Sequence, residues 1–234
     1  MALNLDFSFY NWDLISNFVL KGLYFSLMLT LIATVGGVLL GTVLALMRLS
    51  GQKWLQVPAV IYVNGMRSIP LVMVILWFFL LMPAIIGRPI GAELSAVITF
   101  VAFEAAYFSE IMRAGIQSQP RGQRHAAMAL GMSTWQTYRY VLIPTAVRII
   151  LPPLTSEAMN LVKNSAAAFA VSIAELSQYA MQVQEETSRS YEVYIAVTGL
   201  YMLSAFAVNR LFGFIEQRSR IPGLVVANST PGGR

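Results

Sequence analysis

The sequence predicts an all-α integral membrane protein with five transmembrane helices, and three observations support this prediction. The chain of 234 residues is 57% hydrophobic and only 12% charged, whereas soluble domains are roughly a quarter charged. Apolar runs of about 18 residues or more, long enough to cross a bilayer, recur along the chain. Basic residues gather in alternate connecting segments, which is typical of a chain that crosses a membrane several times.

Five apolar stretches are the predicted spans: 22–47, 57–86, 94–115, 149–174 and 193–215. The first contains no charged residue, and its Gly37 and Gly41 form a GxxxG motif that allows another helix to approach closely. The second contains Pro70 near its start and Pro83 near its end, and these prolines predict a kink or a broken entry into the membrane.

The charges of the connecting segments predict how the chain is oriented. One set of segments contains most of the basic residues: Arg48, Lys53, Arg113, Arg121, Arg124, Arg139, Arg148, Arg210, Arg218, Arg220 and Arg234. The other set contains three basic residues and seven acidic ones: Lys21, Arg88 and Arg189, with Asp6, Asp13, Glu93, Glu175, Glu185, Glu186 and Glu192. Because basic loops stay in the cytoplasm, we expect the N-terminus outside and the C-terminus in the cytoplasm.

This orientation divides the chain into three parts. Residues 1–21 are expected to be a periplasmic or interfacial segment, and residues 22–218 the transmembrane domain. Within that domain, the loop at about 118–144 faces the cytoplasm. The last part, 219–234, is rich in Gly, Pro and Ser, which predicts a cytoplasmic tail.

The cytoplasmic loop has the signals of two short helices. Ser118 is a predicted cap for a helix with Pro120 in its first turn, and Gly131 is the predicted end of that helix. Ser133–Gln136 has the spacing of a capping box that begins a second helix. Pro144 marks the predicted end of the second helix. The loop is therefore expected to be a helix, a glycine bend and a helix at the membrane surface.

His125 is the only histidine, and the chain has no cysteine. A metal site or a nucleophilic site would need partner residues that the loop lacks, so an exposed or interface histidine is the better interpretation. A basic amphipathic helix on anionic lipid is a second interpretation of the loop. The small residues Ala126, Ala127 and Gly131 favour a third, a surface that another protein contacts closely.

The sequence "AAMALG", followed by "IP" at Ile143–Pro144, resembles the EAA loop of ABC importer permeases. In that family the loop is a coupling helix that lies in a groove of the cytoplasmic ATPase. The resemblance implies that His125, Ala126, Ala127 and Gly131 lie at this contact. His125 stands where the family commonly has a glutamate.

Four further segments resemble the polar amino-acid permeases: "RSIPLVMV" (67–74), "FEAAYFSEIMRAGIQS" (103–118), "LPPLTSEAMNLVKNS" (151–165) and "IAELSQ" (173–178). The first two are most similar to glutamate/aspartate permeases. This resemblance implies a permease subunit of a bacterial importer in the inner membrane, which works by alternating access. It also implies a second, different permease subunit, two ATPase subunits and a periplasmic amino-acid-binding protein. The same family carrying basic or other polar amino acids is an alternative, as is a passive channel or scaffold.

Other observations agree with a permease that depends on separate ATPase subunits. The chain has no G-x-x-x-x-G-K-[ST] motif for binding ATP phosphates, so ATP and Mg²⁺ would bind to the partner ATPase and no cofactor to this chain. The basic residues lie in loops between apolar spans, so they are explained by orientation and contact with lipid, without a nucleic-acid partner. The prediction is therefore a transport subunit and not an enzyme.

Polar residues inside the fourth span are the candidate substrate pathway. Glu157, Asn160 and Asn164 share one helical face with Leu161 between them, and Lys163 lies about 120° from Glu157 at about 100° per residue. In one interpretation Glu157 binds the ammonium of an amino acid while the amides bind its carboxylate. In the other, Glu157 pairs with an arginine of a partner subunit and Lys163 bridges helices or extends to the interface. A lone carboxylate would by itself suit a cationic substrate.

The third span has charges of its own. Glu104 lies deep in it with Tyr107 on the same face, and it either borders the pathway or bonds to another helix. Glu110 and Arg113 have the spacing of a local ion pair. Arg67 is expected near the cytoplasmic mouth as an orientation charge, or as an attraction for an anionic substrate as it leaves.

Overall fold

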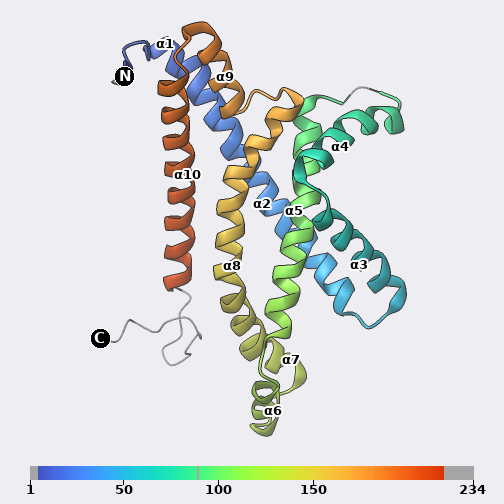
Figure 1. Cartoon of the computed structure of the whole chain (residues 1–234). Coiled ribbons are helices and arrows are strands. Elements are labelled where there is room, and N and C mark those ends of the chain that lie inside the picture. Colours follow the sequence, from blue (N-terminus) through green and yellow to red (C-terminus); the bar gives the residue numbers. More distant parts are fainter. Residues whose placement is uncertain (1–4, 89, 219–234) are drawn as a thin grey trace.

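A computed structural model describes residues 5–88 and 90–218, and within these ranges the chain is helical with no strand (Figure 1). In chain order the elements are α1 (Trp12–Leu14), η1 (Ile15–Val19), α2 (Leu20–Leu49), α3 (Lys53–Ser68), α4 (Leu71–Ile86), α5 (Ala92–Gln117), α6 (Arg121–Ala129), α7 (Thr134–Thr137), η2 (Tyr138–Leu142), α8 (Ile143–Asn164), η3 (Ser165–Val171), α9 (Leu176–Thr187) and α10 (Ser190–Arg218). The predicted tail at 219–234 lies outside the described residues.

Four helical stretches in the described part are long and apolar enough to cross a membrane: Trp12–Leu49, Ala92–Gln117, Thr134–Val171 and Ser190–Arg218. The pair α3 and α4 makes a fifth if it is counted as one span, and its two helices meet at an angle of 110°. The bend occurs at Ile69 and Pro70, so the helix break expected from Pro70 is present. Pro83 lies inside α4 without interrupting it.

The most extensive helix contact in the described structure joins α2 to α5, which cross through the centre of the molecule (Figure 1). A Cβ atom on Gly37 would lie 2.8 Å from the Phe108 ring, and one on Gly41 would lie 2.8 Å from the backbone nitrogen of Ser109. Both contacts are too short for a side chain. The GxxxG motif therefore brings two helices together, as its spacing predicted.

The cytoplasmic loop differs from the prediction at both of its ends. Ser118 ends α5 and does not cap α6, because its hydroxyl donates to the Gly115 carbonyl at 2.9 Å. Pro144 does not end the second helix, since α7, η2 and α8 run on as one helical stretch. The wide turn of η2 comes immediately before Pro144, which then stands in the first turn of α8, where its missing N–H is tolerated.

The middle of the loop follows the sequence signals. Gly131 has φ of +79°, a left-handed conformation that favours glycine. Ser133 and Gln136 form a reciprocal capping box, with bonds of 2.8 and 3.2 Å. The bend between α6 and α7 is therefore fixed by local chemistry, and both helices lie at one end of the molecule (Figure 1).

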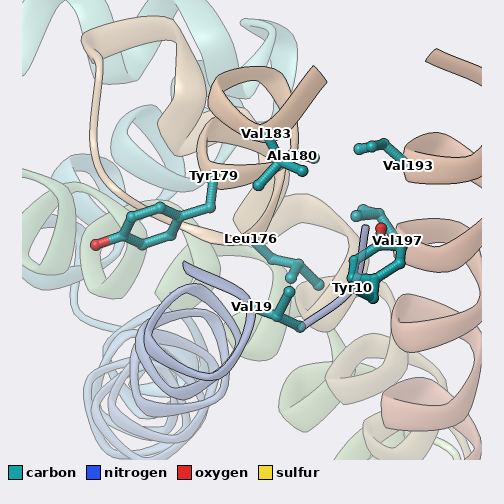
Figure 2. Close-up of a pocket in the computed structure, with 8 residues that line it drawn as sticks. All are labelled: Tyr10, Val19, Leu176, Tyr179, Ala180, Val183, Val193 and Val197. Atoms are coloured by element: carbon teal, nitrogen blue, oxygen red, sulfur yellow. The ribbon is translucent and has the colours of Figure 1, made fainter. Parts of the chain in front are cut away.

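At the other end, α9 packs between the N-terminal segment and α10. Leu176, Val183 and Val193 face one another there around an apolar space of only about 10 Å³ (Figure 2), too small and too apolar to be a binding site. Glu175, fully buried, caps α9 by accepting from the Gln178 N–H at 2.9 Å and from the Tyr201 hydroxyl at 2.6 Å. The bond from Tyr201 joins the start of α9 to α10.

Candidate functional site

The broken span forms one wall of a polar cavity of about 320 Å³. Helices α5 and α8 supply the remaining walls, so the cavity lies where the α3–α4 bend meets the middle of α5 and the C-terminal half of α8. Its lining is Ile69, Pro70, Leu71, Phe103, Tyr107, Glu157, Asn160 and Asn164. A volume of this size lies within the range of small-molecule sites.

Helix α8 supplies the polar side of the cavity. Glu157, Asn160 and Asn164 all line it, while Leu161 between them is fully buried in the core behind. Lys163, the fourth polar residue of this segment in the sequence, is exposed and lies outside the lining. The structure thus brings together the three residues of the predicted stripe and leaves Lys163 apart.

Glu104 lies one layer behind the lining. It is fully buried on α5, beside Glu157 and Asn164. Neither of its carboxyl oxygens makes a hydrogen bond of ordinary geometry within the described residues. Two carboxyl groups on neighbouring helices therefore lie close together, Glu157 in the lining and Glu104 behind it. An unpartnered buried carboxyl is costly unless it is neutral or meets a cation.

Five of the lining residues were not singled out as pathway residues from the sequence. Phe103 and Tyr107 are one turn apart on α5, with ring centroids separated by 5.1 Å. Ile69, Pro70 and Leu71 enter the lining only because the chain bends there. In the sequence, Pro70 is the local signal that predicts the bend. Residue spacing does not predict that the bend packs beside α5 and α8.

A cluster of charges lies beside the cavity, centred on Glu110. The predicted ion pair of Glu110 with Arg113 is present. Arg48 from the end of α2 also bonds the Glu110 carboxylate, and an Arg67 nitrogen from the last turn of α3 lies 3.9 Å from it. The Arg67 guanidinium carbon is 5.6 Å from the centroid of the Tyr107 ring. Three arginines from three helices thus converge on one carboxylate.

The residues expected at the docking surface lie on α6 and the turn that follows it, and none of them lines the cavity. His125, Ala126 and Gly131 are exposed, whereas Ala127 is buried against the rest of the loop. Among residues 5–88 and 90–218, no group of three His, Cys, Asp or Glu side chains could hold a metal ion. The exposed residues of this surface therefore include the small Ala126 and Gly131 together with His125 and the basic Arg124.

Comparison with known proteins places these features in context. Residues 12–221 match a family described as the binding-protein-dependent transport system inner membrane component. The chain is 37% identical over 209 residues to the glutamate/aspartate import permease GltK of Escherichia coli O6:H1, covering 86% of this chain and 93% of GltK. It is 34% identical to GltJ of Escherichia coli K12, another glutamate/aspartate import permease, with 87% of each chain covered.

Solved structures agree with the sequence comparisons. A crystal structure of an amino acid ABC transporter with histidines superposes with a TM-score of 0.81 at 32% identity, covering 92% of this chain and all of that one. An inward-facing MetNI methionine ABC transporter superposes with a TM-score of 0.71 at 21% identity, over 90% of this chain and all of that one. The second likeness concerns the fold alone.

Proposed function

Because the chain belongs to the family of binding-protein-dependent transport system inner membrane components, we propose that it is the permease subunit of an ATP-driven amino-acid importer, with glutamate and aspartate as favoured substrates. It is a transport component of the inner membrane. The names of GltK and GltJ support the acidic substrates. The observation that carries the proposal is the polar cavity between the helix break and α8.

The cavity has groups suited to an amino-acid zwitterion. A charged side chain at membrane depth costs about 2.5–3.5 kcal/mol or more, so it is a functional candidate by default. In this proposal Glu157 binds the ammonium, with Glu104 behind it, and the Asn160 and Asn164 amides donate to the carboxylate. Helix α4 begins at Leu71 on the same cavity, and the free N–H groups of a first turn favour a nearby anion. Lys163 has no role in this site.

The helix break supports an alternating-access mechanism. Transporters of other folds place discontinuous helices at their substrate sites and move rigid helix groups around them. Here α3 and α4 meet at 110° against α5 and α8, so a change in the angle between these helices would open or close the cavity. The expected orientation has the N-terminus outside and the C-terminal end in the cytoplasm.

The proposed partners follow from what this chain has and what it lacks. A second permease subunit, expected to be a different chain, would complete the pathway; two ATPase subunits would bind ATP and Mg²⁺; a periplasmic protein would deliver the amino acid. We place the ATPase contact on α6 and its following turn. The exposed Ala126 and Gly131, with His125, allow a partner's backbone to approach closely, while the buried Ala127 anchors the helix from behind.

The decisive experiment is uptake by the complete transporter in proteoliposomes. Labelled glutamate, aspartate, glutamine, histidine and arginine would be tested with ATP or with a non-hydrolysable analogue. The expected result is uptake that requires ATP hydrolysis and is restricted to the acidic pair. Uptake of arginine or histidine alone would support the second candidate, a carrier of basic amino acids, which the neighbouring carboxyls of Glu104 and Glu157 favour. Uptake that is indifferent to ATP would contradict both.

A further inference from the structure

We propose that Arg67 binds a carboxylate of the transported amino acid, so that the cavity has a fixed cation as well as the anion Glu157. The inference rests on the proposed function and adds a residue that the polar stripe of α8 does not contain. It addresses a chemical mismatch, because carboxyl groups alone favour a cationic ligand while the cavity is proposed to bind an acidic one.

Arg67 lies beside the cavity. It stands in the last turn of α3, two residues before Ile69, where the cavity lining begins. Its guanidinium lies over the ring of Tyr107, which itself lines the cavity. The guanidinium also lies near enough to Glu157 to act on it electrostatically. The cation therefore lies against a side chain that lines the space that the substrate would occupy.

Arg67 is bound less tightly to Glu110 than the two other arginines of the charge cluster are. Arg48 and Arg113 both donate hydrogen bonds to the Glu110 carboxylate. Arg67 approaches that carboxylate only to 3.9 Å, beyond hydrogen-bond distance, and within the described residues it donates no hydrogen bond. Three guanidinium groups face one carboxylate, which leaves a net positive charge of two beside the cavity.

Arg67 is also the most accessible of the three arginines. The Arg67 side chain is 39% exposed, compared with 11% for Arg48 and 27% for Arg113. A long side chain that is half open and not hydrogen-bonded can change rotamer at little cost, and its planar fork matches a carboxylate with two parallel bonds. Arg67 can thus turn from the ring of Tyr107 toward a ligand, whereas Arg48 and Arg113 stay on Glu110.

The test is binding of labelled glutamate and glutamine to the purified complete permease–ATPase complex, without the periplasmic protein, whose own affinity would mask the result. The variants are Arg67→Gln, Arg67→Lys and Glu110→Gln. Removing a charge-assisted bond typically weakens binding by about tenfold or more, so we expect Arg67→Gln to lose that much glutamate affinity. Arg67→Lys should recover part of it. Glu110→Gln, which removes the neighbouring anion and keeps Arg67, should not weaken glutamate binding, since no ligand bond is lost.

The two ligands identify which carboxylate is bound. If Arg67 meets the side-chain carboxylate, Arg67→Gln weakens glutamate binding and leaves glutamine binding unchanged. If it meets the α-carboxylate, binding of both ligands weakens in proportion. Equal glutamate affinity in Arg67→Gln and the unsubstituted protein would overturn the inference. So would an equal loss in Arg67→Gln and Glu110→Gln, because Arg67 would then act only by holding the cluster together.

Failure of the proposed function gives a different pattern. If the unsubstituted complex binds neither ligand, the acidic substrate class is wrong and the inference falls with it. If it binds glutamate and Glu157→Gln weakens that binding while Arg67→Gln does not, the proposed site stands and the role of Arg67 alone is refuted.

Discussion

Gly41 of α2 lies so close to α5 that a Cβ atom at this position would be 2.8 Å from the Ser109 nitrogen and 2.9 Å from the Ala105 carbonyl oxygen. Both neighbours are backbone atoms, so no side-chain rotation can relieve the contact. We expect Gly41→Ala to separate the two helices and lower the stability of the chain by about 1–3 kcal/mol, the usual cost of overpacking. The check is the midpoint of thermal unfolding in detergent. Gly213→Ala in α10 is the control: a Cβ there meets nothing within 4 Å, so a midpoint as low as that of Gly41→Ala would contradict the argument.

Glu157 and Lys163 lie on the same helix but differ in their relation to the cavity, which Glu157 lines and Lys163 does not. If Glu157 binds the ammonium, Glu157→Gln should raise the substrate concentration for half-maximal uptake by about tenfold to a hundredfold, the value of one charge-assisted bond. Lys163→Gln should leave that concentration unchanged. Half-saturation measured in proteoliposomes loaded with ATP separates the two. If both variants changed this concentration equally, both residues would act on the structure of the helix and not on substrate binding.

The turn after α6 offers a test of the ATPase contact. Ala126→Arg adds a large side chain to an exposed helical position without backbone strain, and Gly131→Arg adds it at the bend. We expect both variants to remain in the membrane and to lose uptake while the ATPase either dissociates or hydrolyses ATP without transport. Asn tolerates the left-handed conformation of Gly131, so Gly131→Asn is the control for strain. Full coupling of ATP hydrolysis to uptake in Ala126→Arg would contradict the assignment.

Glu175 predicts a dependence of stability on pH. Burial raises the pKa of its carboxyl group above the usual value, although the Tyr201 hydroxyl and backbone N–H groups oppose this. A raised pKa means that the folded state binds the proton more tightly than the unfolded state. Stability from this group is therefore complete below the unfolded pKa, near 4.3, and is lost as pH rises through the folded pKa.

Unfolding midpoints between pH 4 and pH 8 would measure this contribution. Relative to the unsubstituted chain, Glu175→Gln should become more stable as pH rises, because the variant has no proton to lose. Glu186→Gln, on an exposed position of the same helix, should parallel the unsubstituted chain. A constant difference between Glu175→Gln and the unsubstituted chain across the range would show that Glu175 does not titrate there.

The spans and the polar stripe could be predicted from the sequence because both depend on local periodicity. Apolar runs locate helices in a membrane regardless of their partners, and a spacing of three and four residues places Glu157, Asn160 and Asn164 on one face. The convergence of Arg48 and Arg67 on Glu110 could not be predicted, because those three residues stand on three different helices. Only the Glu110–Arg113 pair could be predicted from the sequence, because its two residues lie one helix turn apart.

The errors at the ends of the loop have a similar cause. Ser118 and Pro144 are common boundary residues, and their sequence neighbourhoods are consistent with helix starts and stops. Ser118 instead completes the helix before it. Pro144 is accommodated by the wide turn at Tyr138–Leu142, which precedes it and is not encoded by any simple residue pattern. Boundary signals locate an interruption but do not determine which of two adjoining helices uses it.

The uninterrupted helical stretch from Thr134 to Val171 has a mechanical consequence. Its first turn adjoins the α6 surface, and Glu157 lies 23 residues further along, about 35 Å at the rise of an α-helix. A helical stretch of this length transmits tilt: a small rotation at the loop displaces the far end sideways in proportion to its length, and Pro152 and Pro153 are the positions inside α8 where the stretch can bend. If the ATPase contact lies on α6, as proposed, a movement there and a movement of the cavity wall at Glu157 are coupled through this one helical stretch.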